Sequence, residues 1–293
     1  MRRPSTGFRV YMTAPTITLN DQTSIPQYGV GVWQVPQAET ERVVSDALEI
    51  GYRHIDTAQM YGNEAGVGAA IKAAGLGRDE LYVTTKLNNG FHEPGKAKAS
   101  LAESLDRLGL DRVDLFLIHW PLPTKYDGDY TATWEALIEL REAGLTTSIG
   151  VSNFQPAHLD TIVERTGVVP AVNQIEVHPY FTNEAARTAT LTHGAQVEAW
   201  SPLGQGGGEL ADPAITAIAE QHGKTPAQVA LRWQLDQGNI VFPKSTHRER
   251  LAENFAVFDF ALSADEVAAL SALDKGEAGR TGPNPDTFDW IPA

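Results

Sequence analysis

Cysteine is absent from this chain of 293 residues. Its absence excludes disulfide bonds, thiolate metal sites and cysteine nucleophiles, so any chemistry must depend on other side chains. Proteins of reducing compartments do without disulfides, and a sequence free of cysteine fits such a compartment. We therefore expect a cytoplasmic protein.

Long apolar runs are absent as well. No stretch approaches the roughly 20 apolar residues that cross a bilayer, so we expect no membrane partner. Arg2 and Arg3 are followed by a polar segment interrupted by proline, which lacks the apolar centre of a secretory signal. We interpret residues 1–13 as a flexible N-terminal tail and residues 14–293 as a single domain.

Positive charge is scarce. The chain has 23 lysine and arginine residues against 37 aspartate and glutamate residues, which gives a formal net charge of -14. Proteins that bind nucleic acid present broad basic surfaces, so a nucleic-acid partner is not expected. An anionic ligand would have to meet a local cluster of cations.

What the chain does contain is a repeating order, in which short β-rich runs alternate with helical patterns such as Leu101, Leu105 and Leu108. Several of these patterns end at a glycine that permits a left-handed C-cap, as at Gly51 and Gly109. Eight strands are predicted, at residues 29–33, 53–56, 81–85, 113–118, 146–150, 171–175, 196–200 and 239–242. Some are continuous apolar runs, which is typical of strands covered on both faces.

A strand followed by a helix, eight times over, predicts an α/β protein with a parallel sheet. Eight such units in 293 residues match the size of a (β/α)8 TIM barrel. We also predict an N-terminal β-hairpin near residues 16–25, and extra helices in the last connections and in the C-terminal segment.

The active site of a TIM barrel lies at the C-terminal ends of its strands. The residues just past the predicted strands are polar or aromatic: Trp33, Asp56, Lys86, His119 with Trp120, Ser152 with Asn153, Gln174 with Glu176, Trp200 with Ser201, and Lys244 with Ser245. The sequence therefore predicts one site at this mouth of the barrel.

Four residues at this mouth form a candidate catalytic group, namely Asp56, Tyr61, Lys86 and His119. A tyrosine has an ordinary pKa of about 10, and a nearby ammonium such as that of Lys86 favours the phenolate and lowers this pKa. Asp56 would keep Lys86 charged, and His119 would hydrogen-bond the oxygen of a carbonyl substrate. We predict Tyr61 as the general acid of a carbonyl reduction.

A reduction needs a hydride donor, and an organic cofactor is expected because the sequence has neither a cysteine pair nor a histidine pattern for a metal. Trp200 offers a flat face to a nicotinamide ring, while Ser152, Asn153 and Gln174 carry donors and acceptors for its carboxamide. A basic, hydroxyl-bearing cluster follows the last strand, at Lys244, Ser245, His247, Arg248 and Arg250. This cluster suits a 2′-phosphate and predicts NADPH, with no metal.

Several motifs, taken together, resemble those of the aldo-keto reductase family. They are Gly51-Tyr52-Arg53-His54-Ile55-Asp56-Thr57-Ala58, Leu117-Ile118-His119-Trp120-Pro121, Gly150-Val151-Ser152-Asn153-Phe154, Asn173-Gln174-Ile175-Glu176, Ser201-Pro202-Leu203-Gly204 and Pro243-Lys244-Ser245. The resemblance runs from about residue 25 to residue 260. It implies a TIM barrel, NADPH-dependent reduction, and a catalytic tetrad of Asp56, Tyr61, Lys86 and His119.

The resemblance also implies cofactor contacts. Ser152, Asn153 and Gln174 would hold the nicotinamide amide, and Trp200 would stack on the ring. Leu203, Gln205 and Gly206 would lie along the pyrophosphate, and Ser201 is a further implied cofactor contact. Lys244, Ser245 and Arg250 would meet the 2′-phosphate, together with His247, which stands where some members have arginine. Glu253 and Asn254 would meet the adenine end.

Within the family, Leu203-Gly204-Gln205-Gly206 and Val257-Phe258-Asp259-Phe260 resemble a bacterial branch similar to 2,5-diketo-D-gluconate reductases. The expected substrate wall consists of Trp33, Asn88, Trp120 and Phe181, with Asn88 standing where many relatives place tryptophan. This apolar, aromatic wall suggests small aldehydes, ketones or α-dicarbonyls as substrates, and we expect a monomer.

Two alternatives stay open. Some relatives of this fold bind cofactor without a mainly metabolic task, so the chain could be a cofactor-binding regulatory subunit with little turnover. Burial can lower the pKa of a lysine, so Lys86 could also form a Schiff base in a barrel aldolase, although Asp56 favours a charged lysine.

Overall fold

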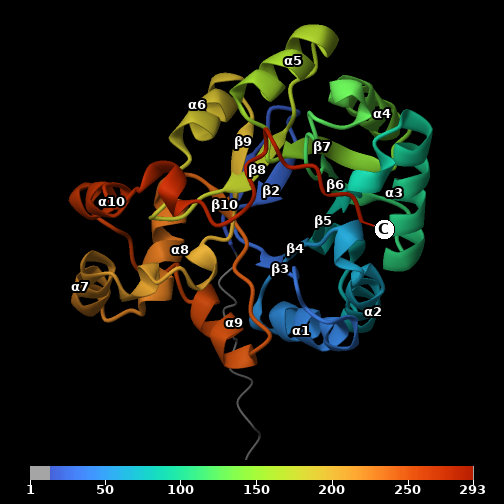
Figure 1. Cartoon of the computed structure of the whole chain (residues 1–293). Helices are drawn as coiled ribbons and strands as arrows, with labels where there is room; N and C mark the ends of the chain where they lie inside the picture. The colour runs from blue at the N-terminus through green and yellow to red at the C-terminus, as the bar shows by residue number, and fades with distance from the viewer. Residues whose placement is uncertain (1–13, 293) are drawn as a thin grey trace, which may run out of the picture.

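The computed structural model describes residues 14–292, and the tail expected at residues 1–13 lies outside the described residues. Figure 1 shows a barrel of strands surrounded by a ring of helices. Between residues 14 and 292, no helix is both long and apolar enough to cross a membrane.

Eight parallel strands form the barrel, and their order in the sheet follows their order in the chain. They are β3 (Val30–Gly31), β4 (His54–Asp56), β5 (Tyr82–Leu87), β6 (Val113–Ile118), β7 (Thr146–Ser152), β8 (Val172–Glu176), β9 (Gln196–Trp200) and β10 (Ile240–Val241). A parallel bridge between Tyr28 and Val241 joins the first strand to the last, and Gly31 N donates to Pro243 O at 3.2 Å. The predicted (β/α)8 barrel is confirmed, and each of the eight predicted strands overlaps an observed one.

A helix follows each strand and packs outside it (Figure 1). These helices are α1 (Gln37–Ile50), α2 (Glu64–Ala74), α3 (Pro94–Leu108), α4 (Tyr130–Glu142), α5 (Pro156–Thr166), α6 (Glu184–Thr192), α8 (Pro226–Asp236) and α9 (Arg248–Phe255). The predicted extra helices are α7 (Pro213–His222), in the connection after β9, and α10 (Ala264–Ser271), after α9. The 3-10 turns are η1 (Gln59–Tyr61), η2 (Arg78–Glu80), η3 (Asn89–Phe91), η4 (Tyr126–Gly128), η5 (Gly204–Gly206), η6 (Glu209–Ala211) and η7 (Gly276–Gly279).

An antiparallel hairpin, β1 (Thr16–Thr18) and β2 (Ser24–Pro26), lies at the N-terminal end of the barrel. Its Ile25 is fully buried in one cluster with side chains of the barrel strands, including Phe242 near β10. Asn20, in the turn of the hairpin, donates its side-chain amide to Pro170 O at 2.9 Å. The hairpin predicted near residues 16–25 is therefore confirmed, and it closes this end of the barrel.

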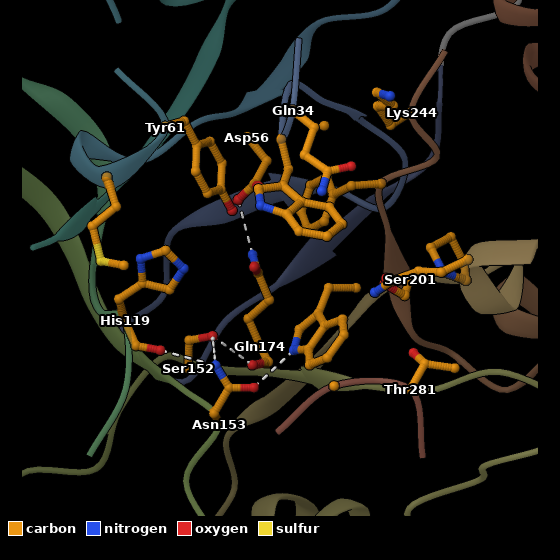
Figure 2. Close-up of a pocket in the computed structure, with 18 of the residues that line it drawn as sticks. Gln34, Asp56, Tyr61, His119, Ser152, Asn153, Gln174, Ser201, Lys244 and Thr281 are labelled. Atoms are coloured by element: carbon orange, nitrogen blue, oxygen red, sulfur yellow. Dashed lines mark hydrogen bonds between the residues drawn. The ribbon is translucent and has the colours of Figure 1, made fainter. Parts of the chain in front are cut away.

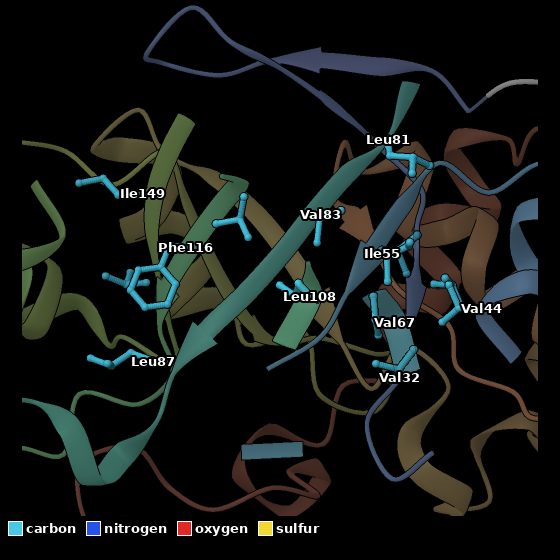
Figure 3. Close-up of a cluster of buried hydrophobic side chains, with 14 of the residues drawn as sticks. Val32, Val44, Ile55, Val67, Leu81, Val83, Leu87, Leu108, Phe116 and Ile149 are labelled. Carbon is cyan, nitrogen blue, oxygen red and sulfur yellow. The ribbon is translucent and has the colours of Figure 1, made fainter. Parts of the chain in front are cut away.

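Side chains alternate between two faces along each strand, and this alternation separates the core from the site. Ile55 and Val83 are register partners on β4 and β5, and both pack in one cluster with Val67 of α2 (Figure 3). Asp56 and Lys86 lie on the inward face of the same two strands and bond to each other inside the barrel. Apolar residues thus lie under the helices, while polar residues gather inside the barrel mouth.

Candidate active site

One cavity of about 610 Å³ lies at the C-terminal ends of the strands. Figure 2 shows Asp56, Tyr61, His119 and Gln174 pointing into this common space. These four residues lie at or just after the ends of β4, β6 and β8, and the barrel brings them together as the position of each after its strand predicted.

Lys86 lies at the centre of the polar group and is completely buried. Its Nζ is 2.8 Å from each carboxylate oxygen of Asp56, 3.0 Å from Thr57 O and 3.4 Å from Tyr61 Oη. Burial favours the neutral amine, but the Asp56 carboxylate and the Tyr61 hydroxyl outweigh it, so the pKa of Lys86 is raised. Lys86 is therefore an ammonium at neutral pH.

Tyr61 reaches Lys86 from the short turn η1, which ends at Gly62. Gly62 has a φ of 66°, a left-handed conformation that glycine adopts without strain. We expected Lys86 to lower the pKa of Tyr61, and it acts in that direction, but burial of the hydroxyl outweighs it and the pKa is raised above 10.0. The phenol consequently keeps its proton at neutral pH, as a proton donor must.

His119 lies beside Tyr61, with 5.7 Å between the ring centroids. Burial, with a smaller effect of the Lys86 charge, lowers the pKa of His119 well below 6.5. Its imidazole is therefore neutral at neutral pH, and it offers a hydrogen bond without adding a second positive charge.

Asn153 connects two sides of the cavity from the end of β7. Its Nδ2 donates to His119 O at 2.9 Å and to Ser152 Oγ at 3.0 Å. Trp200, at the end of β9, donates its indole N–H to Asn153 Oδ1 at 2.8 Å (Figure 2). These bonds hold the Trp200 ring in place along the cavity wall.

Gln174 lies on β8 between Ser152 and the candidate catalytic group. Its backbone oxygen accepts from Ser152 Oγ at 2.8 Å, and its Nε2 donates to Asp56 Oδ1 at 2.9 Å. Ser152, Asn153 and Gln174, which the sequence grouped around a carboxamide, are thus one hydrogen-bonded set on the cavity wall.

The loop after β9 supplies Ser201, Leu203 and Gln205 to the cavity wall, whereas Gly206 does not line it. Gly204 packs directly against the buried Glu209, because a Cβ built on Gly204 would lie 2.4 Å from a Glu209 carboxylate oxygen. This close contact between Gly204 and Glu209 holds the loop after β9 in place.

Only some residues of the predicted cationic cluster are free of ion pairs. Lys244 is exposed and lines the cavity, and neither it nor Arg250 forms an ion pair with any residue between 14 and 292. Arg248 instead pairs with Asp46 and Glu49 on α1, at 2.5 and 2.8 Å. Two free cations therefore remain at this end of the site.

The other predicted residues of this end lie on or just before α9 and do not line the cavity. Ser245 Oγ accepts from His247 N at 3.1 Å in the turn that leads into α9. Glu253 accepts from Thr225 Oγ1 at 2.9 Å, while Asn254 is buried and its backbone oxygen accepts from Tyr28 Oη at 2.5 Å.

Two of the four expected substrate-wall residues line the cavity, Trp33 and Trp120. Asn88 does not, because its side chain accepts from Gly90 N at 2.8 Å and caps the turn η3. Phe181 does not either, since its ring is buried with the Arg280 guanidinium 4.4 Å from the ring centroid.

The C-terminal segment contributes two aromatic residues to the cavity that the sequence interpretation missed, Phe288 and Trp290. The Phe288 ring lies 4.2 Å from that of Trp120 between centroids, and Trp290 O accepts from Asn89 Nδ2 at 3.0 Å. In Figure 1 this segment crosses the barrel mouth. Two aromatic residues in a stretch without helical or strand pattern were the signal that could have identified them.

Glu176, at the end of β8, anchors the C-terminal segment. One of its oxygens accepts from Thr281 N at 2.6 Å and Thr281 Oγ1 at 2.5 Å, and the other accepts from Gly282 N at 3.0 Å. His178 lies between Glu176 and Glu209, with ring nitrogens 3.2 and 2.7 Å from their carboxylate oxygens. This buried cluster joins the strand end to two segments that border the cavity.

Residues 14–292 contain no group of three or more histidine, aspartate or glutamate side chains placed to hold a metal ion. Asp56 and Tyr61, which line the cavity, are engaged with Lys86 instead.

Comparisons with known proteins agree on one family. The family model described as "Aldo/keto reductase family" matches residues 22–275. An aldo-keto reductase of Mycolicibacterium smegmatis is 51% identical over 277 residues, which cover 94% of this chain and 99% of that protein. Methylglyoxal reductase DkgA of Yersinia pestis is 50% identical over 276 residues, which cover 94% of this chain and 97% of that protein. A solved structure of a Gox0644 mutant in complex with NADPH is 44% identical, with a TM-score of 0.90, 95% of this chain covered and 100% of that chain.

Proposed function

The chain belongs to the aldo/keto reductase family, and we propose that it reduces small aldehydes, ketones and α-dicarbonyls to alcohols with NADPH. Family membership confirms the resemblance that the motifs indicated and makes the chain an NADP-dependent oxidoreductase. We assign the activity to a single domain at residues 14–293, because the eight parallel strands form one barrel and the hairpin packs against its strands.

The chemistry of the cavity wall fits a nicotinamide dinucleotide phosphate. Trp200, held by Asn153, offers a ring face, and Gln174 offers a carboxamide. Lys244 and Arg250 are cations free to meet a 2′-phosphate, which supports NADPH over NADH. Bound NADPH would supply a hydride for the carbonyl carbon.

The remaining cofactor assignments follow the family. We assign Ser152 to the carboxamide end with Asn153 and Gln174. The other assigned residues are Ser201, Leu203, Gln205 and Gly206 for the pyrophosphate, Ser245 and His247 for the phosphate end, and Glu253 and Asn254 for the adenine end.

Tyr61 is the proposed general acid, which gives its phenol proton to the carbonyl oxygen. The phenolate that remains is stabilised by the Lys86 ammonium, since two unit charges 3.4 Å apart attract by roughly 5 kcal/mol at an effective dielectric constant of about 20. Asp56 keeps Lys86 charged and in place. His119, neutral and beside Tyr61, hydrogen-bonds and orients the carbonyl oxygen.

The observation that carries this proposal is the position of the Lys86 ammonium, between Asp56 and Tyr61 and completely buried. The same observation opposes a Schiff-base mechanism. An amine must be neutral to attack a carbonyl, and the raised pKa keeps Lys86 protonated.

The proposed substrate wall consists of Trp33, Trp120, Phe288 and Trp290, four aromatic side chains. Such a wall suits small apolar or uncharged carbonyl compounds better than acids. Because a relative with 50% identity is named methylglyoxal reductase, α-dicarbonyls such as methylglyoxal are the proposed substrate class. Asn88 and Phe181 are left out of the wall, since neither lines the cavity.

The test is NADPH consumption with methylglyoxal, aldehydes and keto-sugars, for the wild type and for Tyr61→Phe, with NADPH binding followed by tryptophan fluorescence. We expect Tyr61→Phe to lower kcat by about 100-fold or more, because a positioned general acid contributes roughly 100- to 10,000-fold, while the Kd for NADPH changes by less than about twofold. Loss of NADPH binding together with activity would contradict the role of Tyr61. Tight binding by the wild type with no turnover of any carbonyl would support the alternative of a regulatory subunit.

A further inference from the structure

A second carboxyl group lies one layer deeper in the barrel than the catalytic group, and the proposed mechanism does not use it. Glu198 is on β9, as the register partner of Gln174 on β8, and it is completely buried. Glu198 Oε2 accepts from Gln174 Nε2 at 2.9 Å. The same nitrogen donates to Asp56 Oδ1, also at 2.9 Å.

These two bonds fix the orientation of the Gln174 amide. A primary amide nitrogen has two N–H groups, and Gln174 commits one to Asp56 and one to Glu198. The reverse orientation would turn the amide oxygen toward the Asp56 carboxylate, which has no hydrogen to donate, and would lose the bond to Asp56 Oδ1. The Gln174 carbonyl oxygen therefore remains the free acceptor, on a residue that lines the cavity.

Glu198 is suited to this task because it stays neutral. Burial, and next the negative charge of Asp56, raise the pKa of Glu198 to about 8, although Gln174 and Lys86 oppose the shift. Tyr82 on β5 is the further titratable group that faces it. A neutral carboxyl accepts from Gln174 without placing a second full negative charge beside Asp56, where it would compete for Lys86.

We propose that Glu198 is a positioning residue, which fixes the Gln174 carbonyl toward the nicotinamide carboxamide and steadies Asp56 against Lys86. The inference rests on the proposed function, because Gln174 matters in this way only if a nicotinamide cofactor binds in the cavity. Glu198 touches neither cofactor nor substrate and acts through Gln174. The signal in the sequence is its place two residues before Trp200 on the same strand, which gives both side chains the same face.

The test compares Glu198→Leu, which removes the acceptor at similar volume, with Glu198→Gln, which keeps an oxygen for Gln174. We expect Glu198→Leu to raise the Kd for NADPH by about tenfold and to lower kcat, because one buried hydrogen bond is lost. Glu198→Gln should restore both to within about threefold of the wild type. Ile240→Val, at the register partner of Glu198 on β10, is the packing control and should leave the Kd unchanged.

A double-mutant cycle provides the second measurement. If Glu198 acts through Gln174, Glu198→Ala weakens NADPH binding in the wild type but has no further effect in Gln174→Ala. Equal effects of Glu198→Ala in both backgrounds would overturn the inference, as would wild-type Kd and kcat in Glu198→Leu. A wild type that neither binds nor consumes NADPH would instead refute the proposed function itself.

The cofactor-free protein gives a third measurement. A carboxyl whose pKa rises on folding from 4.5 to about 8 makes the folded state lose stability as the pH rises through this window. Glu198→Gln should remove that part of the loss, measured by urea unfolding at pH 5, 7 and 8.5. An identical pH dependence in the wild type and in Glu198→Gln would show that Glu198 is charged at neutral pH and would overturn its neutral role.

Discussion

Trp200 at the end of β9 is fixed to Asn153, which follows β7 two strands away, because its indole N–H donates to Asn153 Oδ1 at 2.8 Å. Asn153 itself has a φ of 65°, in the left-handed region that few side chains other than asparagine tolerate. The backbone conformation turns the asparagine amide toward His119 and Trp200 together. One residue thus sets the positions of two cavity walls.

Replacing Asn153 separates its backbone role from its side-chain role. Asn153→Gly keeps the left-handed conformation at no steric cost but loses the bonds to Trp200 and His119, so we expect the Kd for NADPH to rise about tenfold. Asn153→Ala loses the same bonds and adds backbone strain of about 1 kcal/mol, measured as a lower free energy of unfolding than in Asn153→Gly. Equal stability of the two variants would contradict the strained conformation.

Removing the Lys86 charge should affect stability and catalysis separately. Lys86→Met leaves the Asp56 carboxylate buried and unpaired, so we expect the free energy of unfolding to fall by roughly 3–5 kcal/mol and kcat to fall at least about 100-fold. The double variant Lys86→Met/Asp56→Asn removes the unpaired charge and should recover most of the stability but none of the activity. Recovery of activity would contradict the assigned role of Lys86.

Lys244 should distinguish the two forms of the cofactor. It is exposed and unpaired within residues 14–292, so we expect Lys244→Met to weaken NADPH binding by about tenfold while leaving NADH binding unchanged. Because exposed charges are screened by salt, the wild-type preference for NADPH should shrink between 0.05 and roughly 0.5 M salt. Arg248→Met is the matched control, since Arg248 is already paired with Asp46 and Glu49. A preference that does not depend on salt would place the phosphate elsewhere.

The buried cluster around His178 should make stability depend on pH. Burial alone would lower the pKa of His178, but its bonds to Glu176 and Glu209 outweigh burial and raise this pKa to about 9. A histidine whose pKa rises on folding adds stability that is complete below pH 6.5 and is lost as the pH rises through about 9. For Glu176 the bonds from His178 and Thr281 outweigh burial and lower the pKa, so its contribution is present above pH 4.5 and is lost at lower pH.

We therefore expect the Tm of the wild type to fall between pH 7 and pH 10, and to fall less in His178→Gln, which does not titrate. The comparison is best made in the Glu198→Gln background, which removes the other buried group that titrates near pH 8. A wild type and a His178→Gln variant with parallel Tm curves above pH 7 would contradict the charged state of His178.

The sequence was sufficient to predict the barrel because its eight units repeat one pattern. Strands such as β6 were predicted with their observed bounds, since six consecutive residues, Val113–Ile118, stand out from the flanking helical patterns. The ends of β5 and β7 lie two residues beyond the predicted ones, at Leu87 and Ser152, because the polar side chains of Lys86 and Ser152 are buried inside the barrel rather than exposed to solvent.

The candidate site was predictable wherever the position of a residue depends on its own strand, as for Asp56 and Lys86. It was not predictable where the position depends on a local turn or on a distant segment. Asn88 follows β5 as expected, yet its side chain caps a local turn. Phe288 lines the cavity in a segment that Glu176, more than a hundred residues earlier, holds through Thr281.

The hairpin at the opposite end of the barrel has a consequence for ligand traffic. Because Ile25 is buried among the barrel side chains there, that end is closed, and ligands reach the cavity from the C-terminal ends of the strands. The C-terminal segment lies across this mouth of the barrel and narrows the entrance to the cavity. For the proposed reductase we therefore expect ordered binding, in which the ligand that lies deeper in the cavity binds first and leaves last, although the hairpin takes no part in the chemistry.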